Sequence, residues 1–134
     1  MQKDIYYDGR LKDWWKPKAG FLVAILLFAT FLGSTTFYKF LQVFVLSLIT
    51  LTGIGFFGHL LNDWGDRTVD ELAGKRNLML GKSVTIFFAL VILALCLALF
   101  PWLFLPKTTF SIVLLGLELL LFLVYALKPF RFKN

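Results

Sequence analysis

Long apolar stretches separated by short polar segments dominate this sequence. Four stretches carry little or no charge and approach the roughly 20 residues that a helix needs to cross the hydrocarbon core of a bilayer. They comprise residues 19–36, 40–61, 83–105 and 108–127. The pattern predicts an all-α, polytopic membrane bundle with four transmembrane helices, and the short connections favour a single domain over residues 1–134.

The composition agrees with a membrane protein. Of the 134 residues, 59% are hydrophobic and 16% are charged, which is too apolar for a soluble domain of this length. The first stretch is longer than the apolar core of a secretory signal, and no A-x-A cleavage site follows it. Cys96 is the single cysteine, so no disulfide framework or thiolate metal site can form within one chain.

The distribution of basic residues predicts the orientation in the membrane. All of the 14 Lys and Arg residues except Lys39 and Lys107 lie before the first stretch, between the second and third, or after the fourth. Because basic residues accumulate on the cytoplasmic side, we expect an integral protein of the cytoplasmic (inner) membrane with both termini in the cytoplasm. The net charge of +6 then reflects orientation and attraction to anionic membrane lipids, and no aromatic-interleaved basic patch indicates nucleic-acid binding.

An acidic segment lies between the second and third stretches, where residues 62–82 are too polar for lipid and form a long connection. It begins with Asn62, Asp63, Asp66 and Asp70. If the second helix continues through them, these side chains fall at roughly 0°, 100°, 40° and 80° around its axis, and so share one face. Oxygen ligands that converge in this way suit Mg²⁺, especially Mg²⁺ that also holds a substrate phosphate.

The same segment resembles the first aspartate-rich motif of the UbiA superfamily of intramembrane prenyltransferases. The residues that carry the resemblance are Asn62-Asp63-x-x-Asp66-x-x-x-Asp70, then Ala73-Gly74-Lys75-Arg76-Asn77, and Gly81. The ending Tyr125-x-x-x-Pro129-x-Arg131-x-Lys133 is similar to the segment that closes the fourth helix in that family. The lead-in Trp14-Trp15-Lys16-Pro17 is similar to its N-terminal approach.

The resemblance implies transfer of a prenyl group from a prenyl diphosphate to an aromatic or lipid acceptor, with Mg²⁺ as the cofactor. It implies that Asp63, Asp66 and Asp70 are catalytic and that Asn62 joins them as metal ligands. Asn62, Lys75 and Arg76 are then expected to bind the diphosphate, since charged donors bind phosphate strongly. Mg²⁺ between carboxylates and phosphates would stabilise the departing diphosphate.

Length distinguishes this sequence from members of that family. By fold-level analogy the family's usual fold has about nine transmembrane helices and a second aspartate-rich motif, whereas this sequence has four apolar stretches and one such motif. We therefore expect the N-terminal half of a prenyltransferase, as a truncated gene, a split gene or a fragment, for which a second chain or a second copy could supply the other half. The alternative is a nonenzymatic membrane scaffold or assembly subunit, or an inactive relic. A CDP-alcohol phosphotransferase is disfavoured because its Asp-Gly-x-x-Ala-Arg lead-in is absent.

A few small or polar residues interrupt the apolar stretches, and each allows two interpretations. Close helix packing and an open groove for a prenyl tail both explain Gly53, Gly55 and Gly58. His59 could line the site or form an interhelical hydrogen bond. Glu118, an intramembrane carboxylate, could face a substrate cavity or bond a polar side chain of the second helix, such as Thr50, Thr52 or His59.

Overall fold

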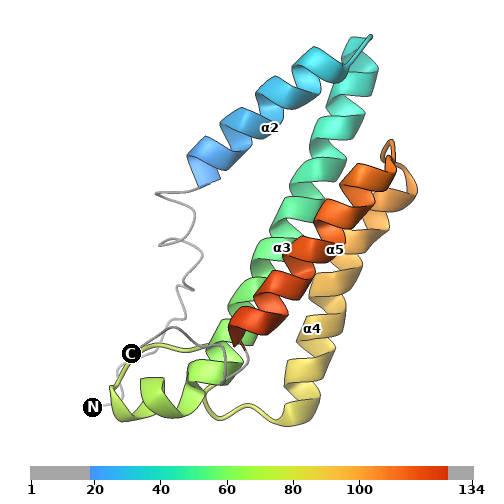
Figure 1. The fold of residues 1–134 in the computed structure, drawn as a ribbon. Helices are drawn as coiled ribbons and strands as arrows, with labels where there is room; N and C mark the ends of the chain where they lie inside the picture. Colours follow the sequence, from blue (N-terminus) through green and yellow to red (C-terminus); the bar gives the residue numbers. More distant parts are fainter. Residues whose placement is uncertain (1–18, 127–134) are drawn as a thin grey trace. The chain divides into compact units, whose positions relative to one another are not determined.

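The computed structural model describes residues 19–126, and these residues form helices joined by turns, without a strand. Helix α2 (Gly20–Gly33) is followed by the long helix α3 (Phe37–Leu72). Helix α4 (Val84–Leu99) continues into the 3-10 helix η2 (Phe100–Leu103), and α5 (Thr109–Ala126) follows (Figure 1). The chain divides into two compact units, Met1–Phe44 and Val45–Asn134, of which the second contains the acidic segment. The predicted all-α class is confirmed for the described range.

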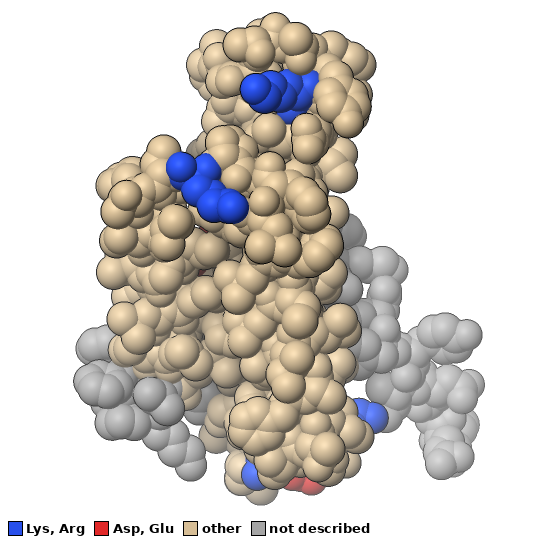
Figure 2. All heavy atoms as spheres, turned by 90° about the vertical axis from the view of Figure 1, so that its right-hand side faces the viewer, with Lys and Arg blue, Asp and Glu red and all other residues tan. Residues whose placement is uncertain are grey.

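Three of the described helices are long and apolar enough to cross a membrane. They are Phe37–Leu72, Val84–Leu103 and Thr109–Ala126. Helix α2 is apolar but has 14 residues, fewer than the roughly 20 that span a bilayer core. A broad uncharged surface, with Lys and Arg side chains only toward its ends, is visible in Figure 2. These helices support the predicted membrane protein.

Helix α3 runs through the acidic segment and ends at Leu72, well beyond its predicted end. Gly74 has a φ of 62°, its N–H donates to the Glu71 carbonyl (3.1 Å), and the Lys75 N–H donates to the Asp70 carbonyl (2.8 Å). This pair of bonds is a Schellman motif, which closes a helix at a glycine in the left-handed conformation. The turn at Gly74 therefore closes the helix after Leu72, and the change from apolar to polar residues does not end it.

The third predicted stretch forms two consecutive helices. The Ser83 hydroxyl accepts the Ile86 N–H (3.3 Å) and so caps α4 at its N-terminus. Pro101 lacks an N–H and cannot continue the α-helical hydrogen bonds, and the chain tightens into η2 around it. The two helices together still make one apolar span, Val84–Leu103.

The backbones of α3 and α4 approach each other closely at Gly53. A Cβ atom added there would lie 2.7 Å from the carbonyl carbon of Leu97 and 2.8 Å from Cα of Ala98. A Cβ atom at Gly58 would lie 2.7 Å from the ring of Phe122 on α5. Small residues at such contacts are typical of helix packing in membranes. Of the two interpretations of these glycines, the structure supports packing at Gly53 and Gly58.

A buried apolar cluster joins the helices next to the acidic end of α3. It comprises Phe57, Leu60, Met79, Phe87 and Ala94. Met79 comes from the connection between α3 and α4, and only 1% of its surface is exposed. Burying a methionine side chain stabilises a fold by about 1.5–3 kcal/mol. The connection is thereby anchored to the helices that it joins.

Candidate functional site

The four predicted oxygen-bearing residues all lie on the last turns of α3. Asp63 and Asp70 are buried, with 3% and 5% of their surface exposed, whereas Asn62 and Asp66 are partly exposed. The two buried aspartates are separated by about two helical turns, so their side chains project from the same side of α3. The predicted shared face therefore contains two buried and two partly exposed groups.

Asn77, in the connection to α4, holds the buried aspartates in place. Its Nδ2 donates to the main-chain carbonyl of Asp63 (2.7 Å) and to Oδ2 of Asp70 (2.9 Å). Its Oδ1 accepts the N–H of Met79 (2.8 Å). Because Asn77 is itself buried, one amide satisfies a helix carbonyl, a carboxylate and a loop N–H that would otherwise lose their hydrogen bonds to water.

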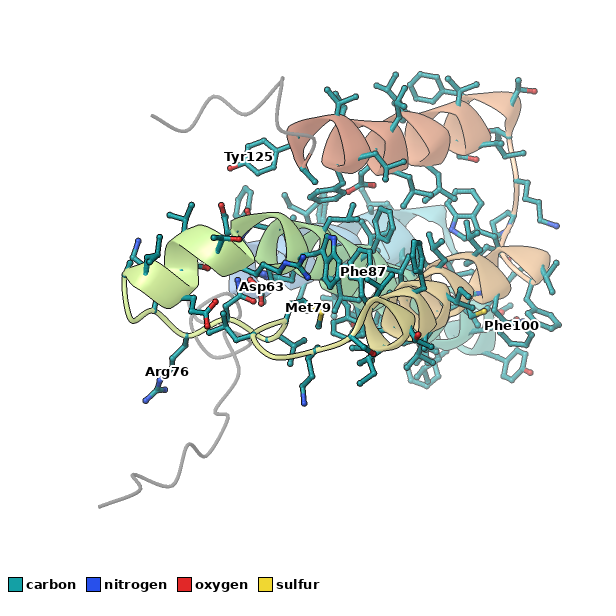
Figure 3. All side chains as sticks on the ribbon, turned by 90° about the horizontal axis from the view of Figure 1, so that it is seen from below. Asp63, Arg76, Met79, Phe87, Phe100 and Tyr125 are labelled. Atoms are coloured by element: carbon teal, nitrogen blue, oxygen red, sulfur yellow. The ribbon has the colours of Figure 1, made fainter. Side chains whose placement is uncertain are left out.

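The carboxylate of Asp63 makes a second link to the same connection. Its Oδ2 accepts the main-chain N–H of Leu78 (3.0 Å), and Asp63 lies on the side of α3 near Met79 (Figure 3). Gly81 then adopts a φ of 67°, which glycine tolerates and which allows the chain to turn toward α4. Asp63 and Asn77 together fix the path of the connection between the two helices.

Lys75 and Arg76 lie on the turn that follows α3, and both are exposed. The Arg76 side chain extends away from Asp63 (Figure 3). The structure thus brings the two cations to the acidic end of α3, on the accessible side of the turn, and the long side chains keep their donors available to a ligand.

Two residues that were not predicted as site residues also lie next to the acidic end of α3: Asn77 in the connection to α4, and Arg67 on α3 itself. Asn77 is the last residue of the motif segment Ala73-Gly74-Lys75-Arg76-Asn77, and the sequence predicts no role for it. Its position in that segment, shortly after the aspartates, is the only sequence feature that points to it. Arg67 lies with its guanidinium carbon 4.0 Å from the ring centre of Trp64, and that ring stacks on Phe87 with centroids 4.4 Å apart. Stacking holds the guanidinium in position while its N–H groups remain free to donate.

Whether these residues fit Mg²⁺ depends on how many ligands the protein must supply. Within residues 19–126, no three His, Cys, Asp or Glu side chains form a group that could hold a metal ion. Mg²⁺ commonly uses one or two carboxylates, and waters and substrate phosphates complete its shell. Asn62, Asp66 and Asp70 succeed each other at about one helical turn. The described residues do not form a cage for Mg²⁺ by themselves, so a site that Mg²⁺ shares with a phosphate ligand is the arrangement that remains for this ion.

Glu118 lies on α5, apart from the acidic segment in the sequence. It is exposed, and no hydrogen bond or ion pair joins it to any residue in the range 19–126. The Thr52 hydroxyl instead donates to the Leu48 carbonyl of its own helix (2.8 Å). Of the two interpretations of Glu118, a bond to Thr50, Thr52 or His59 of α3 is therefore not found among the described residues.

The two ends of the chain that share in the family resemblance lie outside the described residues. These are Trp14-Trp15-Lys16-Pro17 and the positions Pro129, Arg131 and Lys133. No protein-family model matches the sequence, and no curated protein or solved structure matches it.

Proposed function

We propose that the acidic end of α3 binds the diphosphate of a prenyl diphosphate together with Mg²⁺, as the diphosphate-binding part of a UbiA-like prenyltransferase. One observation carries the proposal: a single unbroken helix, Phe37–Leu72, joins an apolar membrane stretch to all four oxygen-bearing side chains. An isoprenoid has the same two-part character, a long apolar tail on a charged head. The tail lies in the membrane beside the apolar turns of α3, and the head lies at the acidic turns.

The residues divide this work between binding and positioning. Asn62, Asp66 and Asp70 supply oxygen ligands from successive turns of the helix. Asp63 has a positioning role, because its carboxylate accepts the Leu78 N–H and fixes the connection that carries the cations. Lys75 and Arg76 are exposed, and in this proposal their side chains donate hydrogen bonds to phosphate oxygens. Bound Mg²⁺ supplies the positive charge that stabilises a departing diphosphate.

The proposal includes the membrane topology. Helix α2 and its flanking residues form a fourth crossing, so that the acidic end of α3 and both termini face the cytoplasm. The acceptor, aromatic or lipid, approaches the same end. In this proposal the aspartate cluster binds one side of the diphosphate, and a partner, either a second chain or a second copy, binds the other side.

A nonenzymatic scaffold is the second candidate, and the hydrogen bonds of the buried aspartates favour it. Asp63 and Asp70 both accept bonds from the connection between α3 and α4. Carboxylates used in this way can serve as structural anchors alone. The two candidates differ at Asp66, which is partly exposed. Asp66 contributes to ligand binding in the prenyltransferase and does not in the scaffold.

Calorimetry on the purified chain tests the proposal. We expect Mn²⁺, a stand-in for Mg²⁺, to bind more tightly when farnesyl diphosphate is present, and Asp66→Asn to weaken this binding by about 10-fold or more. Glu71→Gln is the matched control, because Glu71 is an exposed carboxylate on the opposite side of the same helix. Equal binding by Asp66→Asn and the wild type would favour the scaffold.

A further inference from the structure

Helix α5 packs against its neighbours along one face only. Leu119 and Phe122 contact the buried cluster, yet α5 contains no buried residue. A second set of side chains recurs along the helix with alternating spacings of three and four residues, and we name it the exposed α5 face. It consists of Ser111, Leu114, Glu118, Leu121 and Tyr125. This spacing is the contact pattern of helices that pack side by side, as in coiled coils.

The apolar members of this face are accessible to a partner. Leu114, Leu121 and Tyr125 expose 47%, 59% and 43% of their surface. Leu114 and Leu121 lie about one turn before and after Glu118, so the carboxylate is flanked by side chains that can pack. In a bilayer these residues face either lipid or another helix.

Glu118 lies midway along the exposed α5 face, about one turn before Phe122 and so beside the packed side of the helix. Helix α5 has 18 residues and is therefore about 27 Å long, which places Glu118 near the middle of the bilayer. No hydrogen bond or ion pair links it to a residue in the described range. A carboxylate at this depth is costly in lipid, and acidic residues in membrane helices pair with groups of neighbouring helices.

We propose that the exposed α5 face binds another transmembrane helix that carries a Lys or Arg residue at mid-membrane depth, opposite Glu118. The leucines provide the packing, and the ion pair fixes the register, as a single polar contact position does in coiled coils. This docking surface does not depend on the diphosphate-binding function proposed above.

A second copy of this chain is a poorer occupant than a basic helix. Two α5 helices paired symmetrically through this face bring Glu118 against Glu118, which places like charges together. The described helices carry Lys and Arg only at Lys39 and Arg67, near the two ends of α3. A copy therefore offers no cation at the depth of Glu118 within the described range.

Energy transfer in phosphatidylcholine vesicles tests this proposal with the full chain. The probes are two synthetic transmembrane peptides of leucine and alanine, identical except for a central Lys or a central Leu. We expect the Lys peptide to associate with the wild type about 3- to 20-fold more strongly than the Leu peptide, the range that single polar contacts between membrane helices give. Glu118→Leu should remove this preference, and Glu118→Gln should reduce it.

A double variant with the same amino-acid composition tests whether the position of the carboxylate on α5, and not only its presence, determines the preference for the Lys peptide. In Glu118→Leu/Leu120→Glu the carboxylate moves to the other side of α5, at another exposed position, and we expect no preference for the Lys peptide. Equal association of both peptides with the wild type, or a preference retained by Glu118→Leu or by the double variant, would overturn the proposal. So would Glu118-dependent energy transfer between two copies without peptide. Circular dichroism and gel filtration select variants that remain helical and monodisperse.

Discussion

Asn77 is the side chain on which the arrangement of the acidic segment most depends. Its amide joins a helix carbonyl and a carboxylate of α3 to a main-chain N–H of the following connection, at 2.7, 2.9 and 2.8 Å. These groups are buried, so water cannot easily replace the amide. The cost of removing it is set by the partners that it leaves unsatisfied.

Asn77→Ala should therefore lower the free energy of unfolding by about 2–3 kcal/mol. Unfolding of the purified protein in mixed micelles, followed by circular dichroism as SDS is added, measures the change. Arg76→Ala is the control, since Arg76 is the exposed neighbour of Asn77 and a surface change of this kind stays within about 0.5 kcal/mol. Similar stability of both variants would show that the amide does not hold the connection.

The helices of the second unit are held together through small residues. Membrane helices gain little from apolar burial, because lipid is as apolar as their side chains, and close backbone approach supplies the packing instead. At Gly53 the backbone of α4 occupies the position that a side chain would take. At Gly116 on α5, by contrast, no described neighbour lies within 4 Å of the position that an added Cβ atom would take.

Gly53→Ala should destabilise the unit by about 1–3 kcal/mol, because the added methyl group meets α4 backbone that cannot rotate away. Gly116→Ala should be neutral or stabilising by up to about 1 kcal/mol, because alanine favours a helix. Thermal unfolding of both variants in detergent gives the comparison. If both substitutions had the same effect, the close contact of α3 with α4 would be excluded.

The charges of the whole molecule predict its direction in the membrane. Lys107 lies in the connection between α4 and α5, whereas Thr68 lies on the acidic end of α3 with Arg67, Lys75, Arg76 and Lys82 nearby in the sequence. Basic segments are retained on the cytoplasmic side. The two positions should therefore lie on opposite sides of the membrane.

Labelling of intact cells with a membrane-impermeant maleimide tests this orientation. In a Cys96→Ala background, Lys107→Cys should react from outside, and Thr68→Cys should react only after the cells are permeabilised. Both side chains are exposed in the structure, so accessibility within the protein is matched. The reverse labelling pattern would invert the topology and place the acidic segment outside the cytoplasm.

The sequence alone predicted the all-α class of this protein and the position of its acidic segment. Apolar character is a local property of each stretch, so three long apolar helices could be located before their packing was known. The shared face of Asn62, Asp66 and Asp70 also follows from helical periodicity, given a helix that continues through them.

Tertiary structure decided the partners of the α3 aspartates and which side chains of α5 stay exposed. Asn77 bonds residues 7 and 14 positions earlier in the chain, and Asp63 bonds one 15 positions later. Contacts of this kind depend on where the turn at Gly74 directs the connection, which periodicity does not encode. Likewise, the sequence places Glu118 in an apolar helix, and only the packed structure shows that it makes no hydrogen bond or ion pair with a residue in the described range. Local preference sets which residues form helices, and the long-range contacts set what each helix face can bind.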